Sequence, residues 1–402
     1  MTTPSETLQH SETRVNVIDV LRGFALFGIF MVNMTVFARP IYEYGITMPT
    51  HTAVDSFITW LISFGFETKF YVLFSFLFGY GLAIQLTRTT PQNDSVGARY
   101  TRRLIGLLVL GALHAIFFFF GDILVSYVIL GIFLWLIRGW APRRLVWVAL
   151  AMMGVAVVGR ILLAIADHSM AFAGDASGVL LLAEEARRNY LGSFGQGVYQ
   201  RLQDLVLMYI VTPLLNWPTA FAMFALGLAA GKINFFKNLD QHLPTMRRWL
   251  PWVFALAIIG NGAYWLLYST EQALVYSIIL VSIEAFAAPA LTFCYVFVII
   301  WIVQRSQTGS WLNPLRAAGR MSLTNYLGQA IICSFLFNGW GLGWYGSVNP
   351  SGYVVLVVII FIGQVWLSNW WLQHFSCGPD EWLLRSWTYL QWQPFRNRRI
   401  EA

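Results

Sequence analysis

The 402-residue sequence predicts an all-α polytopic helical membrane protein with about ten transmembrane helices and both termini in the cytoplasm. Apolar residues make up 57% of the chain and charged residues only 11%, which is less than half of the charged fraction of ordinary soluble domains. The apolar residues form repeated runs near twenty residues long, the length at which a helix crosses a bilayer. Basic residues gather in alternate loops, and this asymmetry sets the orientation.

Ten membrane spans follow from the apolar runs. We place them at residues 16–38, 58–86, 103–120, 123–138, 144–166, 205–231, 249–268, 275–304, 318–339 and 352–374. The second run is too long for one upright helix, so either it tilts or residues 55–65 lie in the outer interface. Gly121 and Asp122 alone join the third and fourth spans, which predicts a tight hairpin. Pro218 predicts a kink or break in the sixth span.

The loops and tails differ in charge. The set of loops that ends with the C-terminal tail holds eighteen Lys and Arg residues, whereas the alternate set holds four. By the positive-inside rule both termini are cytoplasmic, and an even number of spans agrees. Residues 167–204 mix charged residues with Ala and Leu, which predicts an amphipathic helix over the outer ends of the spans. The segment at 378–392, GPDEWLLRSWTYLQW, predicts a helix along the inner interface.

Several function classes are excluded by composition and motif. The net charge of +7 is scattered over short loops instead of forming one basic patch, so nucleic acid is not an expected partner. The three cysteines stand alone, without the spacing of a metal site or a disulfide framework. The sequence contains no metal-ligand signature, nucleotide-binding glycine loop or serine-nucleophile motif. The expected partner is the lipid bilayer.

The first span contains three polar residues that an inert anchor does not need. On a helix Asp19 and Arg22 lie on adjacent rows of one face, and Asn33 returns to that face eleven residues after Arg22. The line from Arg22 to Asn33 is roughly 16 Å long. Either Asp19 and Arg22 pair at the membrane edge and fix the helix end, or the stripe faces inward and lines a cavity or substrate path.

Other ionisable residues fall in the outer half of the spans. His114 and Asp122 flank the outer end of the hairpin, where a histidine could exchange protons and a carboxylate could orient it. A packing role for the histidine remains the alternative. Glu67 and Lys69 are two residues apart and point in nearly opposite directions on a helix. Each therefore needs a partner on another helix, unless the lysine extends to the interface. His51 lies in the first outer loop.

A second, cationic group lies at the cytoplasmic ends of the spans. It comprises Arg22, Arg102, Arg103 and Arg320. Guanidinium groups suit phosphate or carboxylate ligands, and they equally suit lipid headgroups. In the ninth span Asn325 lies four residues before Gln329 on one face, from which both could form hydrogen bonds between helices.

Five segments together resemble the YeiB-like bacterial membrane proteins. They are IDVLRGFALFGIFMVNM at 18–34, KFYVLFSFLFGYGLAIQL at 69–86, LHAIFFFFGDILVSYVILG at 113–131, GRMSLTNYLGQAIICSFLF at 319–337 and GPDEWLLRSWTY at 378–389. The resemblance implies a multi-pass protein of the bacterial inner membrane. It also implies four parts, namely a cytoplasmic tail (1–15), an N-terminal transmembrane bundle (16–230), the C-terminal domain of unknown function that defines the family (231–396) and a basic tail (397–402).

More distantly, the first span is similar to that of the membrane acyltransferase superfamily, which includes lysosomal heparan-α-glucosaminide N-acetyltransferase. This similarity implies transfer of an acyl group from a cytosolic acyl-CoA donor to a sugar or lipid acceptor at the outer face. In that hypothesis His114, or else His51, is the general base, and Asp122 orients it. Asn33 or Lys69 stabilises the developing oxyanion charge.

The donor would bind at the inner face. Arg22 and Arg320 would hold its phosphate groups, and Asp19 and Asn325 complete the predicted donor site; no metal ion is expected. Two other functions stay open. The protein is a transporter or flippase for a small metabolite or lipid, or it is a structural partner or sensor subunit whose polar groups serve helix packing alone.

Overall fold

The structure is a computed structural model that describes residues 4–43, 52–87, 95–172, 176–268, 274–305 and 310–396. Its N-terminal half consists of α1 (Pro4–Ala38), the 3-10 helix η1 (Ile41–Glu43), α2 (Ala53–Gly65), α3 (Lys69–Thr87), α4 (Val96–Phe117), α5 (Leu124–Leu136), α6 (Pro142–Phe172), α7 (Ala176–Tyr190), α8 (Phe194–Leu215) and α9 (Trp217–Lys232). Its C-terminal half consists of α10 (Leu239–Tyr268), α11 (Leu274–Arg305), η2 (Ser310–Leu312), α12 (Asn313–Arg320), α13 (Ser322–Phe337), α14 (Pro350–His374) and α15 (Pro379–Tyr389). These described ranges contain no β-strand, only an isolated bridge between Phe375 and Arg396.

The predicted spans all fall on helices. Six stretches of the described residues are long and apolar enough to cross a membrane: Val17–Ala38, Ala53–Thr87, Val96–Phe117, Pro142–Ala166, Leu274–Arg305 and Pro350–His374. A seventh is the pair α8 and α9, bent by 57°. Helices α5 and α13 are apolar but shorter. The fold class is therefore confirmed: this is a polytopic helical membrane protein.

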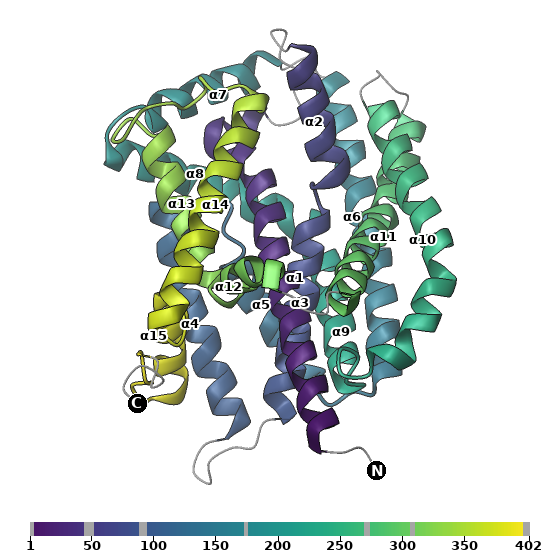
Figure 1. The fold of residues 1–402 in the computed structure, drawn as a ribbon. Coiled ribbons are helices and arrows are strands. Elements are labelled where there is room, and N and C mark those ends of the chain that lie inside the picture. Colours follow the sequence, from purple (N-terminus) through teal and green to yellow (C-terminus); the bar gives the residue numbers. More distant parts are fainter. Residues whose placement is uncertain are drawn as a thin grey trace.

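Helix α1 runs through the middle of the bundle (Figure 1). It packs against α3, α11, α12, α13 and α14, and most of its side chains between Val17 and Ala38 are buried. Leu21, Leu26, Phe30 and Met34 are fully buried. A helix with apolar residues on every face is stable only in such a position or against lipid. The sequence placed polar groups on this same helix, and their partners must therefore be other protein groups.

The two ends of the bundle differ in what covers them. Helices α7 and α2 lie at one end, whereas the start of α1 and helix α15 lie at the other end (Figure 1). An even number of crossings between α1 and α15 is consistent with this arrangement. The predicted amphipathic helix over the outer ends is α7, which buries Ala183, Ala186 and Tyr190. The predicted interfacial helix near the C-terminus is α15.

Glycines allow α3 and α9 to approach closely. A methyl group on Gly79 would overlap the carbonyl oxygen of Phe224, and one on Gly227 would overlap that of Phe76. The two helices therefore pack backbone to backbone, with a glycine on each side of the contact. Gly81, two residues further along α3, has open space beside it.

Three boundaries differ from the predicted ones. The second predicted span consists of two helices, because the chain leaves helical geometry at Phe66–Thr68, where Thr68 has a φ of +66°. The ninth consists of α12 and α13, which meet at Met321 (φ −109°, ψ 32°). Helix α1 begins at Pro4, inside the predicted tail 1–15. Hydropathy indicates where a helix enters apolar surroundings, but it does not indicate where the helical backbone begins or breaks.

Candidate functional site

His114 and Asp122 form a buried pair at the end of α4. The helix ends just after His114, whose carbonyl oxygen accepts hydrogen bonds from the N–H groups of Phe118 and Phe119. The following turn brings Asp122 back to the imidazole, so that Nδ1 and Oδ2 are 2.8 Å apart. The other carboxylate oxygen, Oδ1, accepts from the N–H of Val125 at 3.0 Å and thereby caps the first turn of α5. Both side chains are almost fully buried.

The second imidazole nitrogen, Nε2, is buried and has no hydrogen-bond partner in the described part of the chain. The ring lies against Tyr326 of α13 and Phe119, with centroid distances of 5.1 and 6.2 Å. A carboxylate on Nδ1 fixes the tautomer that leaves Nε2 free to accept a proton, with the proton on Nδ1 inferred from this geometry. The pair is the one that sequence reasoning singled out, and the structure brings its two members into contact.

Lys69 and Glu67 have partners close by in the chain. The ammonium group of Lys69, 3% exposed, donates to the carbonyl oxygen of Ser63 at 3.0 Å. The hydroxyl of Ser63 donates to the carboxylate of Glu67 at 2.7 Å. The partner of Lys69 lies on another helix, as expected, because the break at Phe66–Thr68 folds the start of α3 back toward the last turn of α2, which carries Ser63.

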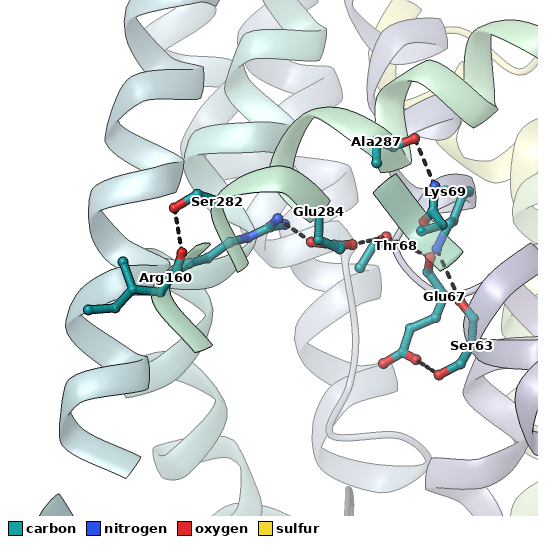
Figure 2. Close-up of polar contacts among 10 residues, drawn as sticks. Ser63, Glu67, Thr68, Lys69, Arg160, Ser282, Glu284 and Ala287 are labelled. Atoms are coloured by element: carbon teal, nitrogen blue, oxygen red, sulfur yellow. Dashed lines mark hydrogen bonds and ion pairs between the residues drawn. The ribbon is translucent and has the colours of Figure 1, made fainter. Parts of the chain in front are cut away.

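That break connects to a buried ion pair between α6 and α11. Arg160 donates from Nη1 to Oε2 of Glu284, and the two side chains are 6% and 9% exposed. The hydroxyl of Thr68 donates to the other oxygen of Glu284 at 2.8 Å. Figure 2 shows Arg160 and Thr68 on opposite sides of the Glu284 carboxylate. A left-handed backbone is costly for a β-branched residue such as Thr68, and such strain is concentrated at functional sites.

Asn33 is half-buried on α1. Its side chain makes no hydrogen bond with another described residue. It is therefore not hydrogen-bonded to the His114–Asp122 pair or to the network around Glu284. Its amide is therefore free to bind another group. His51, the alternative base in the first outer loop, lies outside the described residues.

At the inner end of α1, Asp19 and Arg22 form an ion pair with 3.2 Å between Oδ1 and Nη1. Asp19 is 6% exposed. Helix α12 lies against this part of α1 without a gap: a methyl group on Gly319 would overlap the carbonyl oxygen of Asp19, and one on Gly23 would overlap that of Leu315. This contact puts the carboxylate within electrostatic range of two further arginines, Arg316 and Arg320 of α12.

The inner end of the molecule is therefore rich in arginine. Arg22, Arg316, Arg320, Arg103 and Arg385 are coupled electrostatically to one another or to Asp19. Buried Nε atoms of Arg103 and Arg316 have no hydrogen-bond partner among the described residues. Arg320 is exposed and donates to the carbonyl oxygen of Ser376 at 3.2 Å. A group with this excess of positive charge suits a phosphate or carboxylate ligand.

Asn325 and Gln329 connect α13 to α14. The amide of Asn325 donates to the hydroxyl of Ser368 at 2.9 Å and to the carbonyl oxygen of Ala318 at 3.2 Å. Gln329 donates to the side-chain oxygen of Gln364 at 2.9 Å. These are the interhelical hydrogen bonds that the i, i+4 spacing predicts. Asn325 thus lies next to the arginine-rich end, with its amide engaged in packing.

The predicted residues form two groups and two separate positions. His114 and Asp122 are in contact, and Asp19, Arg22 and Arg320 gather around the α1–α12 contact. Helix α13 spans the distance between these groups, because Gly319 just before it touches Asp19 and Tyr326 within it touches His114. Of the other three, Asn325 lies beside the second group through its bond to Ala318, whereas Lys69 and Asn33 belong to neither group.

The sequence missed two buried polar clusters. Arg160 and Glu284 are 124 positions apart, and nothing in the sequence pairs them. A polar cluster around Arg201 and Asp204 of α8 fell in the outside segment 167–204, for which an amphipathic helix was predicted, although these residues are 2% and 1% exposed. The signal that could have found it is the spacing of Gln200, Arg201 and Asp204, which lie on one side of an otherwise apolar helix.

Comparison with known proteins places the chain in a family. Residues 230–391 match the family described as "Protein of unknown function (DUF418)". The protein YxaH of Bacillus subtilis strain 168 is 33% identical over 402 residues, which cover 96% of each chain. The chain belongs to the YeiB-like family. YeiB of Escherichia coli strain K12 is 27% identical over 391 residues, covering 92% of this chain and 95% of YeiB.

A third YeiB-like relative is a 39.9 kDa protein of Bacillus acidopullulyticus, named for its position in the amylase 3′ region. It is 23% identical over 394 residues, covering 94% of each chain. All three relatives are called uncharacterised. The comparisons confirm the YeiB-like resemblance. They do not show the similarity to membrane acyltransferases. The division of this YeiB-like chain at residues 230 and 231 stays a prediction.

Proposed function

We propose that this YeiB-like protein transfers an acyl group from an acyl-CoA-like donor in the cytoplasm to an acceptor at the outer face of the bacterial inner membrane. The observation that carries the proposal is the His114–Asp122 pair, in which a buried imidazole is held at Nδ1 and free at Nε2. A base oriented in this way by a carboxylate is the arrangement that general-base catalysis requires.

The proposed chemistry needs one base that acts twice. Nε2 of His114 takes the proton from the hydroxyl or amine of the acceptor while its oxygen or nitrogen attacks the thioester carbonyl carbon. The bond from that carbon to sulfur then breaks, and the thiolate leaves with the proton that His114 returns. Asp122 stabilises the imidazolium between the two steps. The products are the acylated acceptor and the free thiol.

The donor would bind through its phosphates at the arginine-rich inner end. In the proposal Arg22 and Arg320 contact the phosphates, Asp19 orients Arg22, and Asn325 holds α13 in place. Arg103 lies eleven residues before His114 on the same face of α4, roughly 16 Å along the helix. An acyl-CoA-like donor has a long chain between its phosphates and its thioester carbon. Such a donor can place its phosphates near Arg103 and its thioester carbon near His114.

Two residues are proposed as donors to the developing oxyanion. Asn33 has an amide without a hydrogen-bond partner in the described chain, which leaves it available. Lys69 donates to Ser63 and would have to exchange that bond for one to the substrate. Removing one such donor typically lowers the rate by two to three orders of magnitude. We therefore expect Asn33→Ala to slow transfer more than it destabilises the fold.

The experiment that tests the proposal is the thermal stability of the purified protein with acyl-CoAs, free CoA and unrelated nucleotides. A ligand that binds only the folded state raises the melting temperature once its concentration exceeds the dissociation constant. The proposal expects a rise specific to acyl-CoA that is lost in Arg22→Ala, followed by thiol release when an acceptor is added. Unchanged melting at saturating acyl-CoA would contradict it.

A second function, transport of a small metabolite or lipid, is favoured by a different observation. Arg160 and Glu284 form a buried ion pair between two membrane-spanning helices, and the strained Thr68 completes it. Ionisable residues within spans mark substrate or ion pathways in many transporters, and the bend between α8 and α9 resembles their broken helices. Net flux of unmodified substrate into liposomes that contain the protein would favour this function over acyl transfer.

A further inference from the structure

A second polar cluster lies at the outer end of the bundle, beneath α7. Its centre is Asp204 of α8, which is 1% exposed. The carboxylate accepts hydrogen bonds from Tyr190 at 2.6 Å, from Gln200 at 2.9 Å and from Tyr42 at 3.2 Å. Three neutral donors thus satisfy this carboxylate, and they come from α7, α8 and the segment η1.

The neighbouring guanidinium of Arg201 is not satisfied in the same way. Arg201 is 2% exposed and forms no ion pair with a described residue. Nη2 donates to the hydroxyl of Ser334 at 3.0 Å, and the guanidinium lies 5.4 Å from the centroid of the Tyr190 ring. Nη1 is buried without a hydrogen-bond partner in the described chain. A buried cation with an unused donor is costly unless another group binds to it.

A small cavity adjoins that guanidinium. Its volume is about 10 Å³, and its walls are Val36, Phe37, Phe118, Phe119, Phe120, Tyr190, Arg201, Ser334, Asn338 and Tyr345. The hydroxyl of Tyr345 is also buried without a partner in the described residues. Two unused hydrogen-bond donors, one of them cationic, therefore meet at a space that holds about one oxygen atom.

The electrostatics favour an anionic occupant over water. A water molecule could accept hydrogen bonds from both donors, but it would add no negative charge beside Arg201, which interacts electrostatically with Asp204 and forms no ion pair with it among the described residues. One oxygen of a carboxylate or phosphate would accept the same hydrogen bonds and neutralise the guanidinium charge. Charge-assisted hydrogen bonds of this kind are about twice as strong as neutral ones. The cavity admits one oxygen only, so the rest of the bound molecule would lie outside it.

We infer that Arg201 and Tyr345 bind one oxygen of a carboxylate or phosphate group of the acceptor, which enters from the outer side. The inference rests on the proposed function for the acceptor's identity, because Phe119 both lines the cavity and lies 6.2 Å from the His114 ring. A molecule anchored at Arg201 thus lies one phenyl ring away from the proposed base. Binding of the anion itself does not depend on acyl transfer.

The test measures melting of the full-length protein in acetate, in inorganic phosphate and in neutral acetamide, with chloride to match ionic strength. We expect acetate or phosphate to raise the melting temperature and acetamide to leave it unchanged; the anion with the larger rise identifies the acceptor's group. Arg201→Gln should abolish the rise. Tyr345→Phe removes a hydroxyl that makes no bond in the fold, so the ligand-free protein should melt normally and bind the anion about tenfold more weakly.

Tyr353→Phe is the matched control, because its hydroxyl is also buried without a partner and does not line the cavity. Equal rises in Tyr345→Phe and the unchanged protein, or no rise with either anion, would overturn the inference and leave water as the occupant. An acyl-CoA rise without an anion rise would overturn it while the proposed function stands. An anion rise without any acyl-CoA rise would support the anion site and count against the proposed function.

Discussion

Glu381 of α15 caps the first turn of α13, because its Oε1 accepts a hydrogen bond from the backbone N–H of Leu323 at 2.7 Å. The other oxygen, Oε2, accepts from the hydroxyl of Thr324 at 2.7 Å. A side chain from the C-terminal helix thus replaces the local cap that α13 lacks. Since α13 contacts both the arginine-rich end and His114, the interfacial helix α15 helps to position the candidate site.

This cap predicts a pH dependence of stability. Burial raises the pKa of Glu381 above its ordinary value of 4.5, so the folded protein binds this proton more tightly than the unfolded chain does. Its contribution to stability is therefore full below pH 4.5 and is lost as the pH rises through the folded-state pKa. In Glu381→Gln this part of the pH profile should flatten. The measurement is the melting temperature from acidic to neutral pH, with the exposed Glu184→Gln as a control whose profile should match the unchanged protein.

The His114–Asp122 pair predicts a loss of activity without loss of fold. Asp122→Asn keeps an oxygen that can cap Val125 but no longer holds the imidazole in the productive tautomer, so acyl transfer should fall by about two to four orders of magnitude. The acyl-transfer rate of His114→Gln should fall by the same factor. Thiol release from acyl-CoA measures both. His374→Gln, at an exposed histidine, should retain full activity, and an active Asp122→Asn protein would rule out this role for the pair.

The Arg160–Glu284 pair predicts a large energetic coupling. Either Arg160→Ala or Glu284→Ala leaves an uncompensated buried charge, so each should destabilise the protein by about 3–5 kcal/mol. The double variant should be less destabilised than the sum of the two, which unfolding of all four proteins would measure. The exposed Arg188 is the control. Its Arg188→Ala change should cost no more than about 1 kcal/mol.

The α3–α9 contact predicts opposite outcomes for two glycines on one helix. Gly79→Ala places a methyl group on the carbonyl oxygen of Phe224, so the helices must separate and the melting temperature should fall by several degrees. Gly81→Ala meets open space, and it should be neutral or slightly stabilising because alanine favours the helix by about 1 kcal/mol. Equal melting temperatures for the two variants would show that the helices do not pack this closely.

Run length and charge asymmetry were enough to predict the fold, because crossing a bilayer constrains both. The His114–Asp122 contact was also predictable, since only eight residues separate the pair and the turn between them is short. The same holds for Asn325, whose spacing from Gln329 defines one face of one helix. Each of these features depends on local geometry that a sequence specifies directly.

Other features depend on which helices become neighbours. Periodicity assigns a face to Arg160 and another to Glu284, but it does not say that α6 and α11 adjoin. The partner of Lys69 could not be named because hydropathy shows an unbroken apolar run where the backbone turns at Thr68. Arg201 was placed in the outside segment 167–204 because a charged residue near a span end resembles an exposed one. Tertiary packing decides all three.

The shortness of α5 determines how lipid meets the candidate base. Its 13 residues rise about 20 Å, roughly 10 Å less than the hydrocarbon thickness. Only its inner half bears strongly exposed apolar side chains, namely Ile132, Phe133 and Leu136, whereas Leu124 and Val128 near His114 are buried. The lipid-facing apolar surface of α5 therefore lies in the half that ends at Leu136, whereas Leu124 and Val128, in the half beside His114, are covered by protein.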